Sequence, residues 1–146
     1  AYDYALQAVE FRERLGQQET LAMVPARMLL AQAYELRGAL AEAEPQLLKA
    51  LALAERGIGT PSGLVAELIE RLAALQLARR DFAGFKPWMR RSLKLLEAAE
   101  GDAQTETQEA WIDTLRAAGE TAEADELTDQ LLAIRNRQSH VLGDLL

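Results

Sequence analysis

Shifted by 42 residues, this sequence matches itself, and that limits the folds open to it. Seven residues between 30 and 55 fall on identical residues between 72 and 97: Leu30, Ala31, Ala41, Pro45, Leu51, Leu53 and Glu55 meet Leu72, Ala73, Ala83, Pro87, Leu93, Leu95 and Glu97. A further match follows at an offset of 39 residues, which aligns Leu72 with Trp111 and assigns Trp111 to the core. Repetition with a period of about 20–50 residues is typical of a solenoid, in which each unit buries its apolar face on its neighbours.

Each repeat has the pattern of two helices joined by a short turn. In the stretch from 27 to 55, Ala31 and Ala43 are small enough to let two helices approach closely, and Tyr34 and Leu47 fill the space beside them. Gly38 lies between the two apolar runs and can adopt the left-handed conformation that ends a helix. The unit predicted by this pattern is a helical hairpin.

The sequence therefore predicts an all-α array of about seven helices. The expected helices are 1–15, about 20–37, 40–56, 64–79, 81–100, 103–118 and 121–138, with Asp81 as an N-cap. As repeats they give the second helix of an incomplete repeat (1–16), three hairpins (19–56, 62–100 and 103–138) and a segment 139–146 that is either a capping turn or a frayed tail. Because Ala1 opens the chain inside a helix and without a start methionine, we expect a fragment of a longer protein.

The spacing of Ala31, Tyr34, Gly38, Ala43 and Leu47 resembles the tetratricopeptide repeat (TPR). The period of 42 and the run Ala-Glu-Pro-Gln-Leu at 43–47 are similar to kinesin-light-chain-type repeats, in which proline falls early in the second helix. The resemblance implies an α-solenoid and covers roughly residues 1–138. It is weaker in the second repeat, where three residues depart from the pattern: Gln76 replaces the packing tyrosine, Arg80 the turn glycine and Phe85 the small alanine.

Composition argues against several classes of function. A net charge of −7 disfavours nucleic-acid phosphates and anionic membranes as ligands. The chain has no cysteine and one histidine, His140, so we expect no metal site, no cofactor and no catalytic activity. The glycine-rich segment 57–63 follows a helix rather than a strand, which indicates an inter-repeat loop rather than a phosphate-binding loop. The absence of cysteine favours a cytoplasmic location and leaves a periplasmic one open.

The resemblance also implies where a partner binds, because the first helices of TPR hairpins line the concave surface. Carried over by alignment, that surface holds six acidic residues against two arginines, so the expected partner is a protein or peptide that is basic or amphipathic. The candidate partner-binding residues are Met28, Leu29, Gln32, Glu70, Arg71, Ala74, Glu109, Asp113 and Arg116. The main interpretation is a non-enzymatic interaction scaffold. The alternative is a regulatory sensor module that holds a small effector or an autoinhibitory segment.

Three other features allow two interpretations each. Trp88 belongs either to ordinary packing or to an apolar contact patch on the opposite face. The basic cluster consists of Arg79, Arg80, Lys86, Arg90, Arg91 and Lys94, and it is either solvated or in contact with an acidic neighbour, which is another repeat or another subunit. The apolar face of the first helix, with Tyr4, Ala5, Ala8 and Val9, packs on the next hairpin or on another molecule, and we expect self-association through an end of the array.

Overall fold

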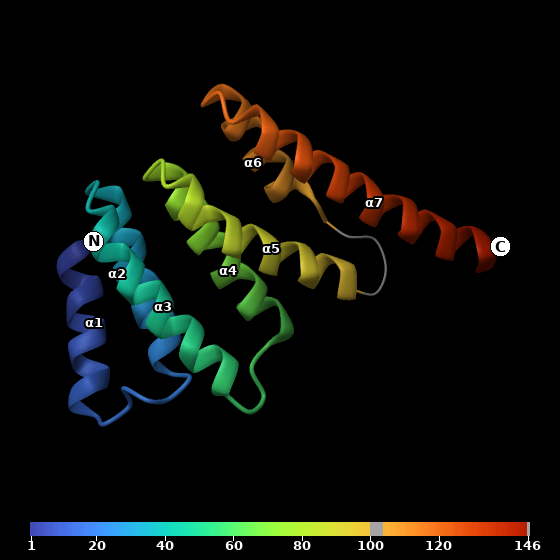
Figure 1. Cartoon of the computed structure of the whole chain (residues 1–146). Helices are drawn as coiled ribbons and strands as arrows, with labels where there is room; N and C mark the ends of the chain where they lie inside the picture. Colours follow the sequence, from blue (N-terminus) through green and yellow to red (C-terminus); the bar gives the residue numbers. More distant parts are fainter. Residues whose placement is uncertain (100–103, 146) are drawn as a thin grey trace.

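The computed structural model describes residues 1–99 and 104–145, and over these residues the chain is entirely helices and their connections (Figure 1). The seven helices are α1 (Tyr2–Arg14), α2 (Met23–Leu36), α3 (Leu40–Arg56), α4 (Ser62–Ala78), α5 (Phe82–Ala98), α6 (Glu106–Ala117) and α7 (Thr121–Leu145). The all-α prediction is confirmed. The last helix continues to Leu145, past the expected end at 138, so the chain around 139–145 is helical rather than a turn.

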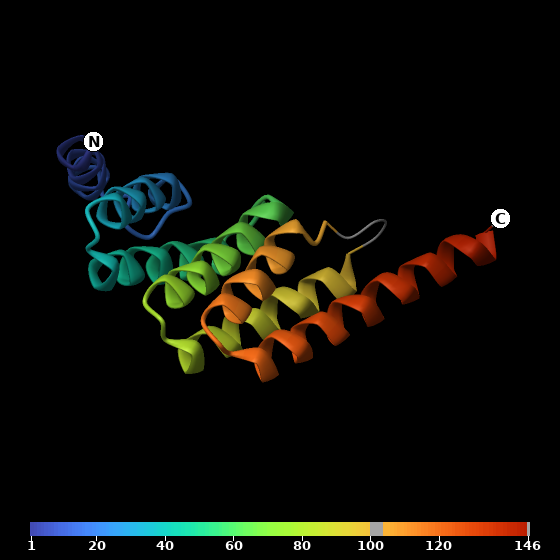
Figure 2. The same cartoon turned by 90° about the horizontal axis from the view of Figure 1, so that it is seen from above.

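The helices pack as antiparallel hairpins in a row. The pairs α2–α3, α4–α5 and α6–α7 form three hairpins, and α1 packs on α2. Between hairpins, α3 contacts α4, α4 contacts α6, and α5 contacts α7. Figure 2 shows the resulting succession, with the two ends of the chain at opposite ends of the array. Each unit thus buries its apolar side on its neighbours, as a solenoid requires.

The turn between the two helices of each hairpin has the same backbone conformation in all three repeats. Gly38, Arg80 and Gly119 occupy equivalent positions, with φ of 74°, 58° and 81°. This left-handed conformation lets the chain reverse after the first helix, and a backbone bond follows it each time, from the next residue to a carbonyl one turn back (Ala39 to Tyr34, Asp81 to Gln76, Glu120 to Leu115). Arg80 therefore adopts the same left-handed backbone as the two glycines, and the turn keeps its shape.

We expect Arg80→Gly to raise the free energy of unfolding by about 0.5–1 kcal/mol, because the left-handed conformation carries a steric cost for every residue with a Cβ. The gain is reduced by loss of the guanidinium contact to the Phe82 ring, whose centroid lies 5.7 Å away. Urea denaturation measures the change. The matched control is Gly119→Ala, where a Cβ meets nothing within 4 Å, so only backbone strain acts and stability falls. Equal stabilities for Arg80→Gly and the wild type would contradict this account.

Two proline-containing helices show one difference from expectation. Pro45 and Pro87 were expected early in their helices, yet each is the sixth residue of its helix, one turn deeper than the positions where a missing N–H has no cost. Pro25, by contrast, is the third residue of α2 and lies in the first turn. The Asp81 N-cap is confirmed: its side chain accepts a bond of 2.9 Å from the Gly84 amide.

The apolar interior consists of two clusters. The first is formed by α1, α2, α3 and much of α4, and in it both Ala31 and Ala43 are fully buried, as the helical-hairpin pattern predicts. The second joins the end of α4 to α5, α6 and α7 and contains Phe85 and Trp111. Trp88 is half-buried and packs against both clusters. Phe85, which departs from the small-residue pattern, contacts Trp111 edge to face with 5.4 Å between ring centroids, and Trp111 is confirmed as core.

The first helix divides its apolar residues between the array and solvent. Ala5 and Val9 are buried in the first cluster, and the Tyr2 ring lies 5.3 Å from that of Tyr34. Tyr4 is 70% exposed and Phe11 is 53% exposed. The packing of α1 on α2 is thus established, whereas self-association through this end stays a prediction.

Candidate partner-binding face

The first helices of the three hairpins present the same exposed positions along the array. Residues of α2 align with residues 42 later in α4 and a further 39 later in α6. We call the strip formed by three such rows the first-helix face; its rows are Leu29, Arg71 and Ala110; Gln32, Ala74 and Asp113; and Leu36, Ala78 and Ala117. Arg71 is half-buried and the other eight residues are exposed. Its surface is mostly apolar or small, with Leu36 76% exposed.

The predicted binding residues divide into two groups. Leu29, Gln32, Ala74 and Asp113 lie in the exposed rows, and Arg116 is also exposed. Four others are half-buried and have structural contacts: Met28, Glu70, Arg71 and Glu109. Met28 packs against the first apolar cluster. Alignment to a surface helix brought both groups together, but the half-buried residues have contacts with neighbouring helices: Arg71 with α2, Glu70 with α6 and Glu109 with α7.

Two of the predicted residues are bound to α7. Glu109 forms an ion pair with Arg135 and accepts a bond of 3.3 Å from the Thr105 hydroxyl. Arg116 lies 3.1 Å from the Asp125 carboxylate. Each charge is therefore already balanced within its own hairpin. Neither residue therefore contributes an unpaired charge beside the first-helix face.

Arg71 joins α4 to α2. Its two terminal nitrogens each donate to the Met28 carbonyl at 3.4 Å, and one lies 3.7 Å from the Glu35 carboxylate. A groove of about 350 Å³ runs beside it, lined by Glu35, Leu40, Arg71, Ala74, Leu75 and Ala78. The arginine thus holds the first two hairpins in register and forms one wall of a groove on the first-helix face.

Unpaired negative charge on this side comes from three exposed carboxylates. Glu67 and Glu106 are equivalent positions on α4 and α6, and Asp113 lies two turns further along α6. Among the residues that the structure describes, none of the three has an ion-pair partner. They leave this side of the array with three unpaired negative charges.

Glu70 differs from these three because its surroundings disfavour its charge. Burial raises the pKa of the Glu70 carboxyl above its ordinary value; the Gln108 amide opposes this rise and the nearby Glu67 adds to it. Gln108 is fully buried and donates from Nε2 to the Ser92 hydroxyl at 2.8 Å and to Glu70 Oε1 at 3.4 Å. Ser92 and Gln108 were not among the predicted site residues, although Ser92 is a polar residue at a position that holds Ala50 and Leu131 in the other repeats, and that is a readable signal.

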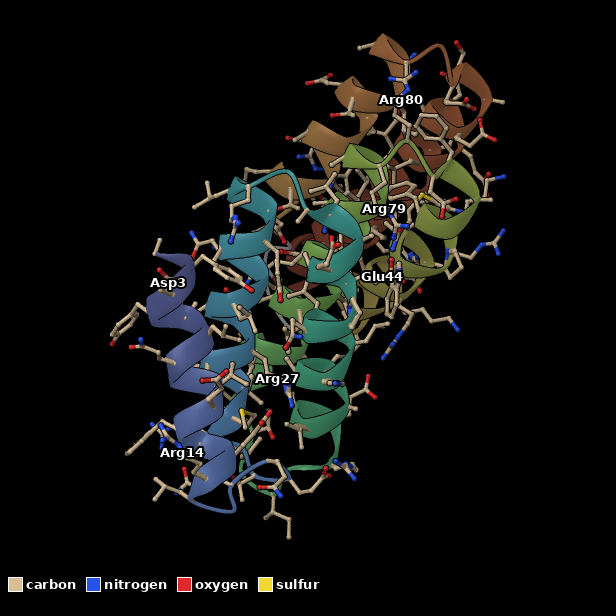
Figure 3. All side chains as sticks on the ribbon, turned by 90° about the vertical axis from the view of Figure 1, so that its left-hand side faces the viewer. Asp3, Arg14, Arg27, Glu44, Arg79 and Arg80 are labelled. Atoms are coloured by element: carbon tan, nitrogen blue, oxygen red, sulfur yellow. The ribbon has the colours of Figure 1, made fainter. Side chains whose placement is uncertain are left out.

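Three of the six residues of the basic cluster form ion pairs with neighbouring repeats. Arg79 pairs with Glu44 of α3, and Figure 3 shows the two side chains side by side. Arg91 pairs with Glu55 of α3, and its guanidinium also lies 5.4 Å from the Trp88 ring centroid. Lys86 lies 3.3 Å from Glu123 of α7. Of the two interpretations of this cluster, contact with acidic residues of another repeat holds for these three cations. Trp88 packs between hairpins.

A buried arginine joins the first three helices. Arg27 is 8% exposed and donates to Gln46 of α3 at 2.8 Å, and it lies 3.7 Å from Glu13 of α1 (Figure 3). Its position aligns with Ile69 and Gln108 in the later repeats. One repeat position, at the boundary with the preceding helix, thus carries either an apolar residue or a polar one that bonds across the boundary.

Solved structures of two proteins share this arrangement of hairpins. BtubC (BKLC) from P. vanneervenii matches with a TM-score of 0.74 over 94% of this chain at 19% identity. A putative kinesin light chain of P. anserina, described as having nearly identical TPR-like repeats, matches with a TM-score of 0.60 over 93% of the chain at 21% identity. This chain is a TPR-like α-solenoid. The TPR-like array spans 56% of the length of the first structure and 66% of the second.

Sequence comparisons, possible membrane spans and possible metal sites were also considered for this TPR-like array. No family model and no curated protein matches the sequence. Within residues 1–99 and 104–145, no helix is both long and apolar enough to cross a membrane. The same residues contain no group of three or more His, Cys, Asp or Glu side chains placed to hold a metal ion.

Proposed function

We propose that this TPR-like array is a non-enzymatic protein-interaction module whose first-helix face binds a basic, amphipathic helix or peptide. The observation that carries the proposal is the combination of exposed apolar or small residues on the first-helix face with unpaired acidic residues on it and one turn beside it. Leu29, Leu36 and Ala74 offer apolar contact, and Glu67, Glu106 and Asp113 supply negative charge beside it. A helix with an apolar stripe flanked by lysine or arginine complements both properties.

The array geometry supports a partner in helical or extended form. Three rows of equivalent positions run across α2, α4 and α6, so a partner that follows the strip meets side chains at the same three positions of each hairpin. The groove of about 350 Å³ between α2 and α4 gives the apolar side of such a partner a place to enter. Exposed apolar residues in a contiguous strip with a polar rim are characteristic of protein-interaction sites.

Charge reversal on the strip tests the proposal. The probe is a fluorescently labelled amphipathic peptide made of lysine and leucine at helical spacing, and the reference is the same peptide with glutamate in place of lysine. The test variant reverses the three unpaired acids (Glu67→Lys, Glu106→Lys and Asp113→Lys). We expect it to bind the lysine peptide about tenfold more weakly at low salt, mainly through slower association, with a smaller difference above about 0.15 M salt.

A second triple variant keeps the total charge change the same but places it off the strip. It reverses exposed acids on α1 and α7: Glu10→Lys, Glu126→Lys and Asp129→Lys. We expect this control to retain most of the affinity, because steering by net charge alone is weaker than local complementarity. Equal losses in the two variants, or equal affinity of the array for the lysine and glutamate peptides, would remove the first-helix face as the binding site.

A further inference from the structure

Three polar side chains meet where α4, α5 and α6 come together: Glu70, Ser92 and Gln108. Ser92 is 3% exposed and Gln108 is fully buried. One repeat earlier, at the equivalent junction of α2, α3 and α4, the same three positions hold Met28, Ala50 and Ile69, which are all apolar. The fold therefore does not require polar groups at this junction, and their presence needs another explanation.

The polar junction costs stability compared with its apolar equivalent. The side-chain oxygen of Gln108 is buried without a hydrogen-bond partner among the described residues, and the Glu70 carboxylate is half-buried. Desolvation of such groups is unfavourable unless they are fully paired. Local choices that work against folding are expected at functional sites, where the cost is offset by binding.

A hollow of about 410 Å³ opens beside these side chains. Glu70 and Ser92 line it together with the apolar residues Ala66, Leu95 and Leu96. Gln108 donates to Oε1 of Glu70, so Oε2 is the carboxylate oxygen left for another donor. The hollow thus combines one negatively charged hydrogen-bond acceptor, the Glu70 carboxylate, with apolar walls that suit a hydrocarbon chain.

We propose that this hollow, the Glu70 hollow, binds the primary ammonium group of an alkylamine, and that in the complex it receives one lysine side chain of the partner. The lysine assignment rests on the proposed function, whereas binding of the amine itself does not. A four-carbon stem fits the apolar wall, and the compact ammonium group needs one carboxylate oxygen. A guanidinium prefers to bind both oxygens of a carboxylate, and here it would share Oε1 with the Gln108 amide, whereas an ammonium group needs Oε2 alone.

The test uses n-butylammonium chloride as the probe and amide chemical shifts of the isotope-labelled array as the readout. We expect saturable shifts in residues around Ala66, Glu70 and Leu95 for the wild type. Glu70→Gln keeps the shape and removes the charge, and it should weaken binding at least tenfold. The matched control is Glu10→Gln, which removes the same charge from an exposed position on α1, away from the hollow and from the first-helix face, and should bind as the wild type does. The spectrum of each variant shows directly whether it is folded.

Several outcomes separate the possibilities. Non-saturable shifts, or the same affinity in Glu70→Gln and the wild type, would overturn the Glu70 hollow as an amine site. Tighter binding of n-butylguanidinium than of n-butylammonium would overturn the choice of ammonium. Amine binding at the hollow together with no binding of the lysine–leucine peptide would sustain the site and refute the first-helix face. Peptide binding unaffected by Glu70→Gln would sustain that face and refute the lysine anchor.

Discussion

Replacing Trp111 by alanine lowers the free energy of unfolding by about 3–5 kcal/mol, because a large buried ring is removed and the surrounding side chains close the gap only in part. Trp111 is 4% exposed and meets Phe85 edge to face with an interplanar angle of 89°. Such a pair adds about 0.5–1.5 kcal/mol beyond the area it buries. Trp111 is in α6 and Phe85 in α5, so the loss falls at the boundary between the second and third hairpins.

Chemical denaturation followed by circular dichroism measures this change, and fluorescence of Trp88 follows the second hairpin separately. Because neighbouring hairpins stabilise each other, the variant should lose α6 and α7 at a lower denaturant concentration than the rest of the array. Leu132→Ala is the control: this α7 side chain is 49% exposed, and its loss should change stability by less than about 0.5 kcal/mol. A Trp111→Ala protein as stable as that control would show that the second apolar cluster does not depend on this ring.

Replacing Ala43 by leucine destabilises the array by about 1–3 kcal/mol through overpacking. Ala43 is fully buried in α3, in the first apolar cluster, and so is Ala31 in α2. A leucine there has to push α2 and α3 apart or take a strained rotamer. The hairpin α2–α3 would lose the close approach that its small residues allow.

The midpoint of urea denaturation tests this expectation, with Ala41→Leu as the matched control on the same helix. Ala41 is exposed, and alanine and leucine have similar helix propensities, so the control should be close to neutral. An unchanged midpoint for Ala43→Leu would mean that Ala43 does not lie at a tightly packed helix–helix contact.

The periodicity of small and apolar residues was sufficient to predict the all-α array, its turns and most helix bounds. The turn at Arg80 was found from its alignment with Gly38, and its left-handed backbone follows from the repeat rather than from the residue itself. The bounds of α3 were predicted as they are found, 40–56, and they make Pro45 its sixth residue; only the family resemblance implied a position nearer the start of the helix.

The site was predicted less completely than the fold. Alignment located the exposed row of Gln32, Ala74 and Asp113, since exposure follows helical periodicity. It could not show that Glu109 is paired with Arg135, which comes from a helix 26 residues later and depends on side-chain geometry. Nor did the count of acidic residues distinguish Glu70 from the exposed carboxylates, because the rise in its pKa comes from its burial.

The division of the interior into two clusters has a mechanical consequence. Helix α4 contributes Leu68 and Leu72 to one cluster and Ala73 and Leu77 to the other, so it is the joint between two semi-independent halves. A stretching force applied to the two ends would act on α4 and on each hairpin boundary in series. A helix bound along α2, α4 and α6 would span the joint and act as a splint, so that the occupied array resists extension and bending more than the empty one.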